Sequence, residues 1–449
     1  MTISPATPLH FIPEGKLDAA ALSPAQRDWA AANGFAGQRG RLVALPGEGG
    51  AIAGFVFGTG GDADRSPFLA GLAAASLGEG QYRLEGDFGD ATLASIAFRL
   101  GAYRFDQYRE PRPAPVLVLP ETADAEEVER QVVAATLARD LINTPANDLG
   151  PDAMEAAARA FASSNGMQIN VIAGDDLLAQ NFPMIHAVGR ASAQAPRLLD
   201  LSWGDADAPK VTLVGKGVTF DTGGLDIKSA AGMLMMKKDM GGAANVLGLA
   251  HTIVSAGLKV RLRVLLPVVE NSIASAAFRP GDVLRSRAGL TVEIGNTDAE
   301  GRLILADALA LADEEAPDLL LDMATLTGAA RVALGPDLPA LYSNDDEVAA
   351  QLAAAGRKAE DPLWPMPLWG NYDSQLASKI ADLNNTGSGG YAGSVVAALF
   401  LRRFVKKASI WAHLDIFGWS SEARPGRPVG ATDQGIRAAY GFICQRFGK

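Results

Sequence analysis

The sequence predicts an α/β protein with a small N-terminal α/β domain, residues 1–122, and a larger domain, residues 123–449, built on a mostly parallel central sheet flanked by helices. Two observations predict this class. Short apolar, β-branched segments alternate with Ala- and Leu-rich segments, which is the pattern of strands and covering helices. In addition, a chain of 449 residues with 48% hydrophobic residues has enough apolar side chains for two or three domains.

The N-terminal region contains the first set of alternating elements. Short strands within residues 41–119 alternate with helical segments such as residues 91–104. The stretch from Arg109 to Ala125 contains four prolines and ends in polar residues, so we place the domain boundary near residue 122. A helix predicted from Glu126 to about Ile142 then leads into the second domain.

The second domain contains strands that read as nearly continuous apolar runs, as expected when both faces of a parallel sheet are covered. The predicted strands are residues 168–172, 197–202, 211–214, 261–268, 318–323 and 408–416. Helical segments separate most of them. Ligands bind α/β sheets at the carboxyl ends of the strands, so polar residues that directly follow a strand are candidates for a functional site.

Residues 296–303, with the sequence NTDAEGRL, form the first group of such residues. A short strand is predicted before them, over residues 291–295, and a buried helix directly after them. The connecting loop therefore carries the carboxylates of Asp298 and Glu300 and the guanidinium of Arg302. Ordinary capping of the helix N-terminus is the alternative explanation for acids at this place.

A second group of polar residues lies upstream, within residues 211–245. Asp221 lies in a glycine-rich loop, and Asp239 is predicted in the first turn of a helix that begins near Met236. Lys216 directly follows a buried strand, so its amine must reach water, pair with an acid or bind a metal as a neutral ligand. Pairing is the simpler alternative. Two groups with compatible spacing favour a metal site over two independent helix caps.

Both groups closely resemble the leucyl aminopeptidase (cytosol aminopeptidase) family of two-metal peptidases. NTDAEGRL matches the signature of that family, and GKGVTFDTGG, MKKDMGGAA and DMATLTGAARVALG match its order and spacing. The resemblance covers roughly residues 125–449 and becomes weak before them. It implies a metal-dependent aminopeptidase acting on peptides with a free N-terminus, with leucine and other apolar N-terminal residues preferred.

The resemblance also implies two divalent metal ions per subunit, Mn²⁺ or Zn²⁺. The tighter site would take Lys216, Asp221, Asp239 and Glu300, and the second site would take Asp221, Asp298 and Glu300. Charge supports this division, because four facing carboxylates raise one another's pKa unless cations balance them. Oxygen ligands with one amine suit hard or borderline ions, so the residues alone leave Mn²⁺, Mg²⁺, Co²⁺ and Zn²⁺ open.

The mechanism that the resemblance implies is hydrolysis by a water that bridges the two ions. Lys228 and Arg302 match the two catalytic side chains of the family. Lys228 would stabilise the oxyanion of the intermediate, where negative charge develops. Arg302 would bind a bicarbonate as the general base, at a helix start whose free amides already favour an anion.

Substrate contacts are also carried over from the family. They correspond to Met236, Thr325, Leu326 and Gly328 of this chain, with Ala431 as a further residue of the pocket for the first side chain. A methionine on a helix more often fills a core, which is the alternative for Met236.

Asp226 departs from the family pattern by adding a carboxylate near Lys228. As a solvated loop acid it would have no catalytic consequence. As the salt-bridge partner of Lys228 it would weaken the stabilisation of the oxyanion.

Composition limits the other possibilities. The net charge of −11 argues against general binding to nucleic acids or anionic membranes. No apolar run is long enough to span a bilayer, and the first residues lack the pattern of a secretory leader, so we expect a cytoplasmic protein. Cys444 is the only cysteine, which excludes a disulfide within the chain. A homohexamer is expected from the family resemblance alone.

Two alternative functions remain open from the sequence. A related metallohydrolase, such as a cysteinylglycine dipeptidase or an amino-acid amidase, would share the metal ligands, because the pocket rather than the metals selects the substrate. A non-catalytic interaction protein, for instance a DNA-binding relative, would keep the fold without the chemistry. The presence of every motif residue and the acidic charge argue against this second alternative.

Overall fold

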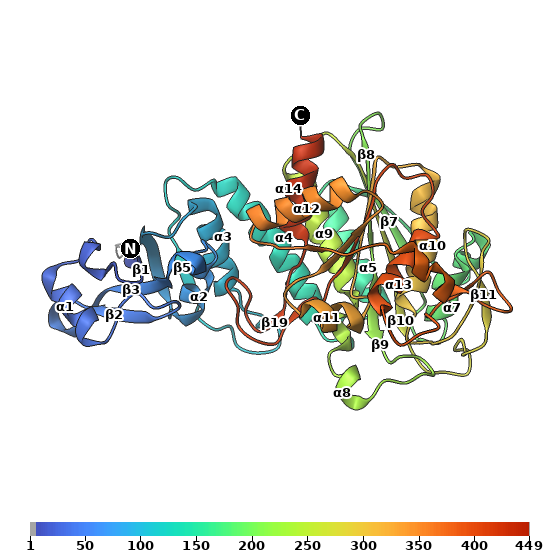
Figure 1. Ribbon diagram of the computed structural model, residues 1–449, viewed down its shortest axis with the longest axis horizontal. Coiled ribbons are helices and arrows are strands. Elements are labelled where there is room, and N and C mark those ends of the chain that lie inside the picture. Colours follow the sequence, from blue (N-terminus) through green and yellow to red (C-terminus); the bar gives the residue numbers. More distant parts are fainter. Residues whose placement is uncertain (1–5, 449) are drawn as a thin grey trace. The chain divides into compact units, whose positions relative to one another are not determined.

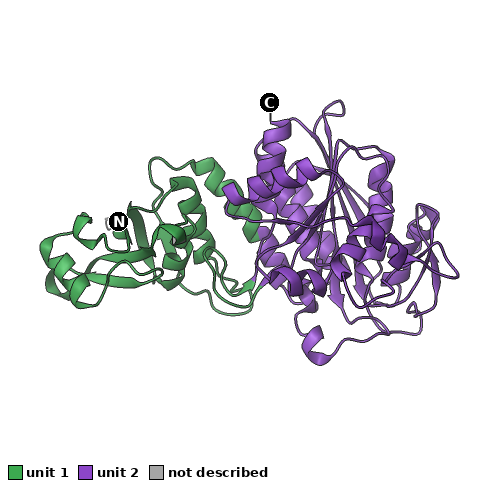
Figure 2. Ribbon diagram, viewed as in Figure 1, with its two compact units in different colours: residues 1–136, 420–430 green, residues 137–419, 431–449 purple. Residues whose placement is uncertain are grey.

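The computed structural model describes residues 6–448 of the chain. Two compact units make up the chain: residues 1–136 with 420–430, and residues 137–419 with 431–449 (Figure 2). The division falls inside helix α4 (Ala125–Asn143), whereas the sequence places a domain boundary near residue 122, which stays a prediction.

The first unit is a small α/β domain, as the sequence predicts. Its five-stranded sheet has the order β2-β3-β1-β4-β5, with β2 antiparallel to β3 and all other neighbours parallel. The strands are β1 (Thr7–Pro13), β2 (Leu42–Pro46), β3 (Ile52–Gly60), β4 (Gly80–Gly86) and β5 (Pro115–Leu117). The helices are α1 (Pro24–Ala32), α2 (Leu69–Ser76) and α3 (Ala91–Ala102), with short 3-10 helices η1 (Leu17–Ala19), η2 (Glu48–Gly50) and η3 (Asp62–Asp64). Leu9, Phe11 and Phe57 form one core with residues of α2 and α3.

The second unit is built on a nine-stranded sheet. Its order is β15-β14-β17-β13-β8-β10-β7-β6, and β9 pairs with β10 beside this path. Strands β17, β13, β8, β10 and β9 run parallel, whereas β6, β7 and β14 form antiparallel pairs, so the predicted mostly parallel sheet is confirmed. The strands are β6 (Gln168–Ala173), β7 (Arg197–Trp203), β8 (Lys210–Gly215), β9 (Gly217–Asp221), β10 (Arg261–Asn271), β13 (Leu319–Ala324), β14 (Ala340–Ser343), β15 (Trp364–Pro365) and β17 (Trp411–Asp415).

Helices cover both faces of this sheet (Figure 1). One face carries α5 (Pro151–Ser164), α9 (Gly241–Ser255) and α14 (Ile436–Phe447), and the other carries α7 (Pro183–Gly189), α10 (Gly301–Glu314) and α13 (Gly393–Arg402). The remaining helices are α6 (Asp176–Ala179), α8 (Ala230–Met233), α11 (Gly328–Leu334), α12 (Asp346–Lys358) and 3-10 helices η4 (Met236–Met240) and η5 (Gly370–Leu376). A two-stranded sheet pairs β18 (Trp419–Ser420) with β19 (Gly430–Ala431).

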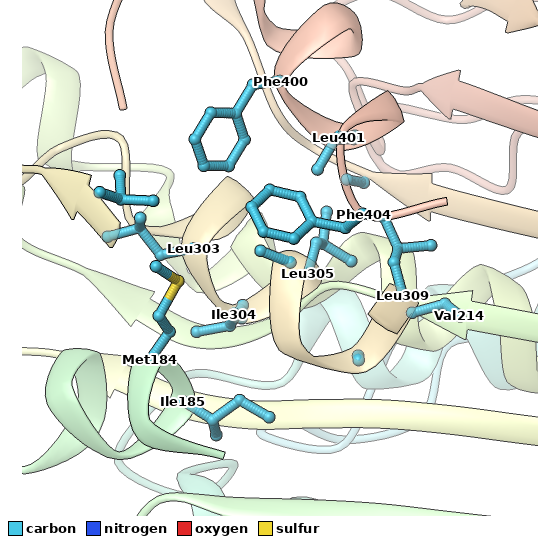
Figure 3. Packing of buried hydrophobic residues seen from close by; sticks show 14 of the residues in the cluster. Met184, Ile185, Val214, Leu303, Ile304, Leu305, Leu309, Phe400, Leu401 and Phe404 are labelled. Atoms are coloured by element: carbon cyan, nitrogen blue, oxygen red, sulfur yellow. The ribbon is translucent and has the colours of Figure 1, made fainter. Parts of the chain in front are cut away.

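Helix α10 is buried along most of its length, as its mostly apolar sequence predicts. Figure 3 shows Leu305 and Leu309 of α10 packed near Val214 of β8 and Phe404, with Met184 of α7 in the same cluster. Each fully buried leucine contributes about 1.5–3 kcal/mol relative to an exposed one. Because α10 is held from several sides, the loop that enters it is held in a defined position.

Helix α9 begins with Gly241 and Gly242 because it packs very closely on the sheet. A Cβ atom on Gly242 would lie 2.1 Å from the carbonyl oxygen of Met323 in β13. The sequence predicts a helix from Met236, and the structure divides this segment: η4 contains Asp239, and α9 begins only at Gly241. Asp239 therefore lies in a tight 3-10 turn between the cavity and the sheet.

The strand before NTDAEGRL is β12 (Thr291–Glu293), and it lies outside the central sheet. It pairs with β11 (Val283–Arg285) and β16 (Leu383–Asn384) in a small sheet of three strands. The loop that carries Asp298 and Glu300 therefore does not continue from a central strand, a feature that the local sequence pattern does not reveal.

Among residues 6–448, no helix combines the length and the apolar character needed to cross a membrane.

Candidate metal centre

The five predicted metal ligands converge on one cavity of about 590 Å³. Lys216 lies between β8 and β9, and Asp221 is the last residue of β9. Asp239 comes from η4, and Asp298 and Glu300 come from the loop that enters α10. The carboxyl ends of central strands thus supply Lys216 and Asp221, and loops supply the other acids.

Asp221, Asp298 and Glu300 form the centre of this group. Each offers one carboxylate oxygen, and the three oxygens lie within 4.8 Å of one another. Burial, together with the charge of Asp221, raises the pKa of Asp298 to about 6 and that of Glu300 to about 8. The carboxylates therefore repel one another and lack enough solvent to screen that repulsion.

Two lysines lie against the acids. The Nζ atom of Lys216 is 2.8 Å from Asp239 Oδ2 and 3.0 Å from Glu300 Oε1, and it donates to the carbonyl oxygen of Thr325 at 3.1 Å. Lys228 lies 2.7 Å from Asp221 Oδ2 and also pairs with Asp298. Burial opposes the charge on both amines, but the neighbouring acids raise the pKa of each lysine above its ordinary value.

The donor set fits divalent cations. Within residues 6–448, Glu300 Oε2 is buried without a hydrogen-bond partner, although a buried carboxylate oxygen needs a donor or a cation. Burial raises the pKa of Asp239, against the opposing effect of Lys216. Carboxylate oxygens with one amine suit hard or borderline ions such as Mg²⁺, Mn²⁺ or Zn²⁺. Lys216, Asp221, Asp239, Asp298 and Glu300 can therefore hold metal.

Gly301 gives Lys216 the space it needs. A Cβ atom at position 301 would lie 2.4 Å from Cε and 2.6 Å from Nζ of Lys216. Any larger residue would displace the amine from the acids.

Further residues orient the predicted ligands. Asn271, the last residue of β10, donates from Nδ2 to Asp221 Oδ1 at 2.8 Å, and Gly223 N donates to the same oxygen at 2.9 Å. Thr325 Oγ1 donates to Asp239 Oδ1 at 2.8 Å. Sequence reasoning missed Asn271; its only local signal is a polar residue at the end of an apolar strand, opposite Asp221 in the register.

Asp226 connects the two loops that carry the ligands. Its Oδ2 accepts from Thr297 N at 2.8 Å and from Thr297 Oγ1 at 3.2 Å, and its own N–H donates to Thr297 Oγ1 at 2.9 Å. The residue is exposed, as expected for a loop acid. Its hydrogen bonds position the residue next to Asp298, while Lys228 pairs with Asp221 and Asp298.

Arg302 is buried in the first turn of α10. One guanidinium nitrogen, Nη1, donates to the carbonyl oxygen of Asn385 at 2.7 Å, whereas Nε is buried and has no hydrogen-bond partner in the part of the chain that the structure describes. Burial lowers the pKa of Arg302 to about 10, against the opposing effect of Glu300 and Asp415. A buried guanidinium with an unused N–H at a helix start suits an anion.

The predicted catalytic and substrate residues line the same cavity as the ligands. These residues are Lys228, Met236, Arg302, Thr325, Leu326 and Gly328. Ala431 does not belong to the lining described for this cavity; it is buried, and its N–H donates to Asn143 Oδ1 at 3.1 Å. The expectation for Ala431 therefore stays a prediction.

Sequence reasoning also missed a basic wall of the cavity, formed by Lys238, Arg331 and Phe417. Lys238 is only 5% exposed, and its Nζ lies 4.7 Å from the centroid of the Phe417 ring. Cζ of Arg331 lies 4.7 Å from the same centroid. Burial lowers the pKa of Lys238 to about 8. The sequence offers one indication, a second lysine directly before the buried Asp239.

Comparisons with protein families match almost the whole chain. The model described as the cytosol aminopeptidase family, catalytic domain, matches residues 136–440. The model described as the M17 aminopeptidase, N-terminal domain, matches residues 7–120. This second match includes the region where the sequence motifs give only a weak resemblance.

Individual proteins give the same result. The chain is 42% identical over 365 residues to a probable cytosol aminopeptidase of Syntrophotalea carbinolica, which covers 77% of this chain and 73% of that protein. The crystal structure of the cytosol aminopeptidase from Coxiella burnetii is 44% identical, covers 100% of this chain and 98% of that chain, and has a TM-score of 0.93. A structure of the bottromycin maturation enzyme BotP in complex with Mn is 34% identical, covers 98% and 99% of the two chains, and has a TM-score of 0.89.

Proposed function

The chain belongs to the cytosol aminopeptidase family and is therefore an aminopeptidase, a hydrolase; we propose that it uses two divalent metal ions to remove N-terminal residues, preferably leucine and other apolar residues, from peptides. The observation that carries the proposal is the group of Asp221, Asp298 and Glu300, whose oxygens lie within 4.8 Å of one another in one cavity. Facing carboxylates of this kind are the usual ligands of paired metal ions in hydrolases.

We assign one ion to Lys216, Asp221, Asp239 and Glu300, and the other to Asp221, Asp298 and Glu300. When bound, such ions supply a Lewis acid for the scissile carbonyl and lower the pKa of a bridging water, which serves as the nucleophile. The complex of BotP with Mn supports Mn²⁺ as an occupant, and Zn²⁺ is compatible with the same donors.

Lys228 is the proposed donor to the oxyanion. Its amine lies 2.7 Å from Asp221 Oδ2, and the neighbouring acids raise its pKa, so it stays protonated at neutral pH. A fixed ammonium beside the reacting carbonyl stabilises negative charge as that charge develops.

Arg302 is the proposed site of a bicarbonate that acts as general base. Its Nε has no hydrogen-bond partner, and the side chain lines the cavity at the start of α10. An anion held there would supply a general base at the start of α10.

The substrate is proposed to be a peptide with a free N-terminus. Met236 and Leu326 contribute apolar surface to the cavity, which suits a leucine side chain, and Thr325 and Gly328 contribute polar atoms beside it. The free α-amine binds near Asp239 and Glu300, where acids favour a basic group, so N-acetylation abolishes binding.

We further place the protein in the cytoplasm and expect a homohexamer. The first proposal is supported by the cytosol aminopeptidases that the chain resembles. The second is supported by the resemblance of its motifs to the family. Cell fractionation and sedimentation velocity test these two proposals.

The decisive experiment compares leucyl p-nitroanilide with its N-acetylated counterpart after chelation and after addition of Mn²⁺ or Zn²⁺. We expect metal to restore cleavage of the free-amine substrate only. Cleavage that survives complete chelation would exclude metal catalysis. The absence of cleavage with every metal would instead indicate a hydrolase of narrower specificity.

A further inference from the structure

The basic wall of the cavity contains a buried cation without an acidic partner. Lys238 is 5% exposed, and within residues 6–448 its Nζ forms no ion pair; its closest described interaction is with the ring of Phe417. Burying an unpaired charge is costly, so such a group is uncommon unless a ligand supplies the opposite charge.

Arg331 adds a second cation to the same wall. Its Cζ lies at the same distance of 4.7 Å from the Phe417 ring centroid. The carboxylate of Asp239, the next residue in the chain after Lys238, pairs with Lys216. The two oxygens of Asp415 accept from Leu326 N, Thr327 N, Thr327 Oγ1 and Ser394 Oγ. Within residues 6–448, neither Lys238 nor Arg331 forms a direct ion pair, and both lie against the Phe417 ring instead.

The acids on the other side of the cavity do not neutralise Lys238 and Arg331. Five basic side chains line the cavity against four acidic ones. Lys216 and Lys228 form ion pairs with all four acids, and the proposed divalent ions would engage those acids further. The basic wall is therefore positive both with and without metal.

We infer that Lys238 and Arg331 form a subsite for a carboxylate, so that the enzyme removes N-terminal glutamate and aspartate in addition to apolar residues. This inference rests on the proposed function. Lys238 is adjacent in the chain to Asp239, near which we place the substrate α-amine, so the first side chain of the peptide lies along this wall. The methylenes of glutamate pack on Phe417 and Met236, and its carboxylate pairs with the two cations. An N-terminal lysine is repelled by the same groups.

The sharpest test compares glutamyl with glutaminyl p-nitroanilide, because the two side chains have nearly the same shape and differ in charge. With Mn²⁺-loaded enzyme we expect kcat/KM to be at least about tenfold higher for glutamyl than for glutaminyl substrate. We expect lysyl p-nitroanilide to be at least about 100-fold poorer than leucyl p-nitroanilide.

Lys238→Met removes the buried cation and keeps the length of the side chain. We expect it to lower the glutamyl-to-glutaminyl ratio of kcat/KM to about one, mainly through KM. Arg331→Gln changes an exposed residue and therefore leaves the fold intact; we expect it to lower the ratio about threefold. Lys237→Met is the matched control, because Lys237 lies on the same turn but outside the cavity lining, and its ratio should equal that of the wild type.

A binding experiment separates charge recognition from turnover. Free L-glutamate should raise the Tm of the wild type more than L-glutamine does, and Lys238→Met should remove this difference. The inference is overturned if leucyl substrate is cleaved while the glutamyl-to-glutaminyl ratio is near one in the wild type or unchanged in Lys238→Met. Failure of the proposed function has a different result, namely no cleavage of any free-amine substrate by any metal-loaded form.

Discussion

Both units of the chain place a cavity at the carboxyl ends of parallel strands, but they treat charge differently. In the first unit, a cavity of about 420 Å³ lies against the ends of β1 and β4. Two of the ion pairs at this cavity are exposed: Arg65 pairs with Asp87 at 3.1 Å, and Glu85 pairs with Arg83, which lies outside the lining, at 2.9 Å. In the second unit, acids from three segments are forced together with little solvent between them.

The difference shows that the strand topology produces a cavity but does not by itself produce a catalytic or metal-binding site. Exposed ion pairs contribute only about 0–1 kcal/mol each and leave little charge for a ligand. Buried carboxylates repel one another, and a divalent cation relieves this repulsion. A functional centre is therefore indicated by unbalanced buried charge more than by the position of a cavity in the fold.

The largest expected effect comes from removing one charge from the buried group. Glu300→Gln should lose metal and lower kcat/KM on leucyl p-nitroanilide by about 1000-fold or more, because this acid is proposed to bind both ions. The corresponding change in the first unit, Glu85→Gln, should keep activity within about twofold. Metal content and kinetics of both variants test the contrast. Two tightly held ions in Glu300→Gln would contradict the ligand assignment.

Lys228→Ala should separate metal binding from catalysis. We expect it to keep bound metal and to lower kcat about 100-fold, because the variant loses a donor to the oxyanion. Lys16→Ala, which removes a lysine from the cavity of the first unit, is the control and should leave kcat unchanged. A loss of metal from Lys228→Ala would mean that the lysine holds the site together rather than acting on the substrate.

Asp226→Ala tests whether the contact between the ligand loops matters. The variant loses the acceptor for Thr297 N, so Asp298 should be less well positioned and metal affinity should fall about tenfold. Asp87→Ala breaks an exposed pair in the first unit and should leave affinity unchanged. Metal titration followed by activity measures both variants. Equal affinity in Asp226→Ala and the wild type would show that the loop is held by its other contacts.

The smallest expected effect is on the pH dependence of folding stability, to which one histidine in each unit contributes. Burial lowers the pKa of His10 in the first unit, whereas for His413 in the second unit Asp322 overcomes the effect of burial and raises the pKa. His10 therefore favours folding more as pH rises towards its unfolded value of about 6.5. The contribution of His413 is fully present below about 6.5 and is lost as pH rises through its folded pKa.

An NMR titration of ¹³C-labelled histidine measures these directions. The chain has four histidines, and His10→Gln and His413→Gln assign the two resonances. We expect the His10 signal to titrate below pH 6.5 and the His413 signal above it. If both signals titrate below pH 6.5, or both above it, the proposed contrast between the units is wrong.

The local sequence predicts much of the centre because its ligands lie in short segments. Asp221 and Lys228, like Asp298 and Glu300, are close enough in the chain for a loop pattern to identify them. The α/β class and the parallel sheet were predictable from alternating apolar segments, and the structure confirms both.

The contacts that the sequence did not predict join distant segments. Asn271 reaches Asp221 across 50 positions and Asp226 reaches Thr297 across 71, and no periodic pattern links such pairs. The basic wall needs Lys238 and Phe417, which become neighbours only when η4 and the end of β17 fold together. The placement of β12 in a side sheet has the same cause, because its partner β16 lies far along the chain.

The glycine at position 301 has a consequence for engineering. A Cβ atom there would collide with Cε of Lys216, so the identity of this residue sets how far the amine can reach. Attempts to change metal selectivity by random mutagenesis will find position 301 closed to substitution, although its codon is one base change from alanine. New selectivity must come from other residues that line the cavity.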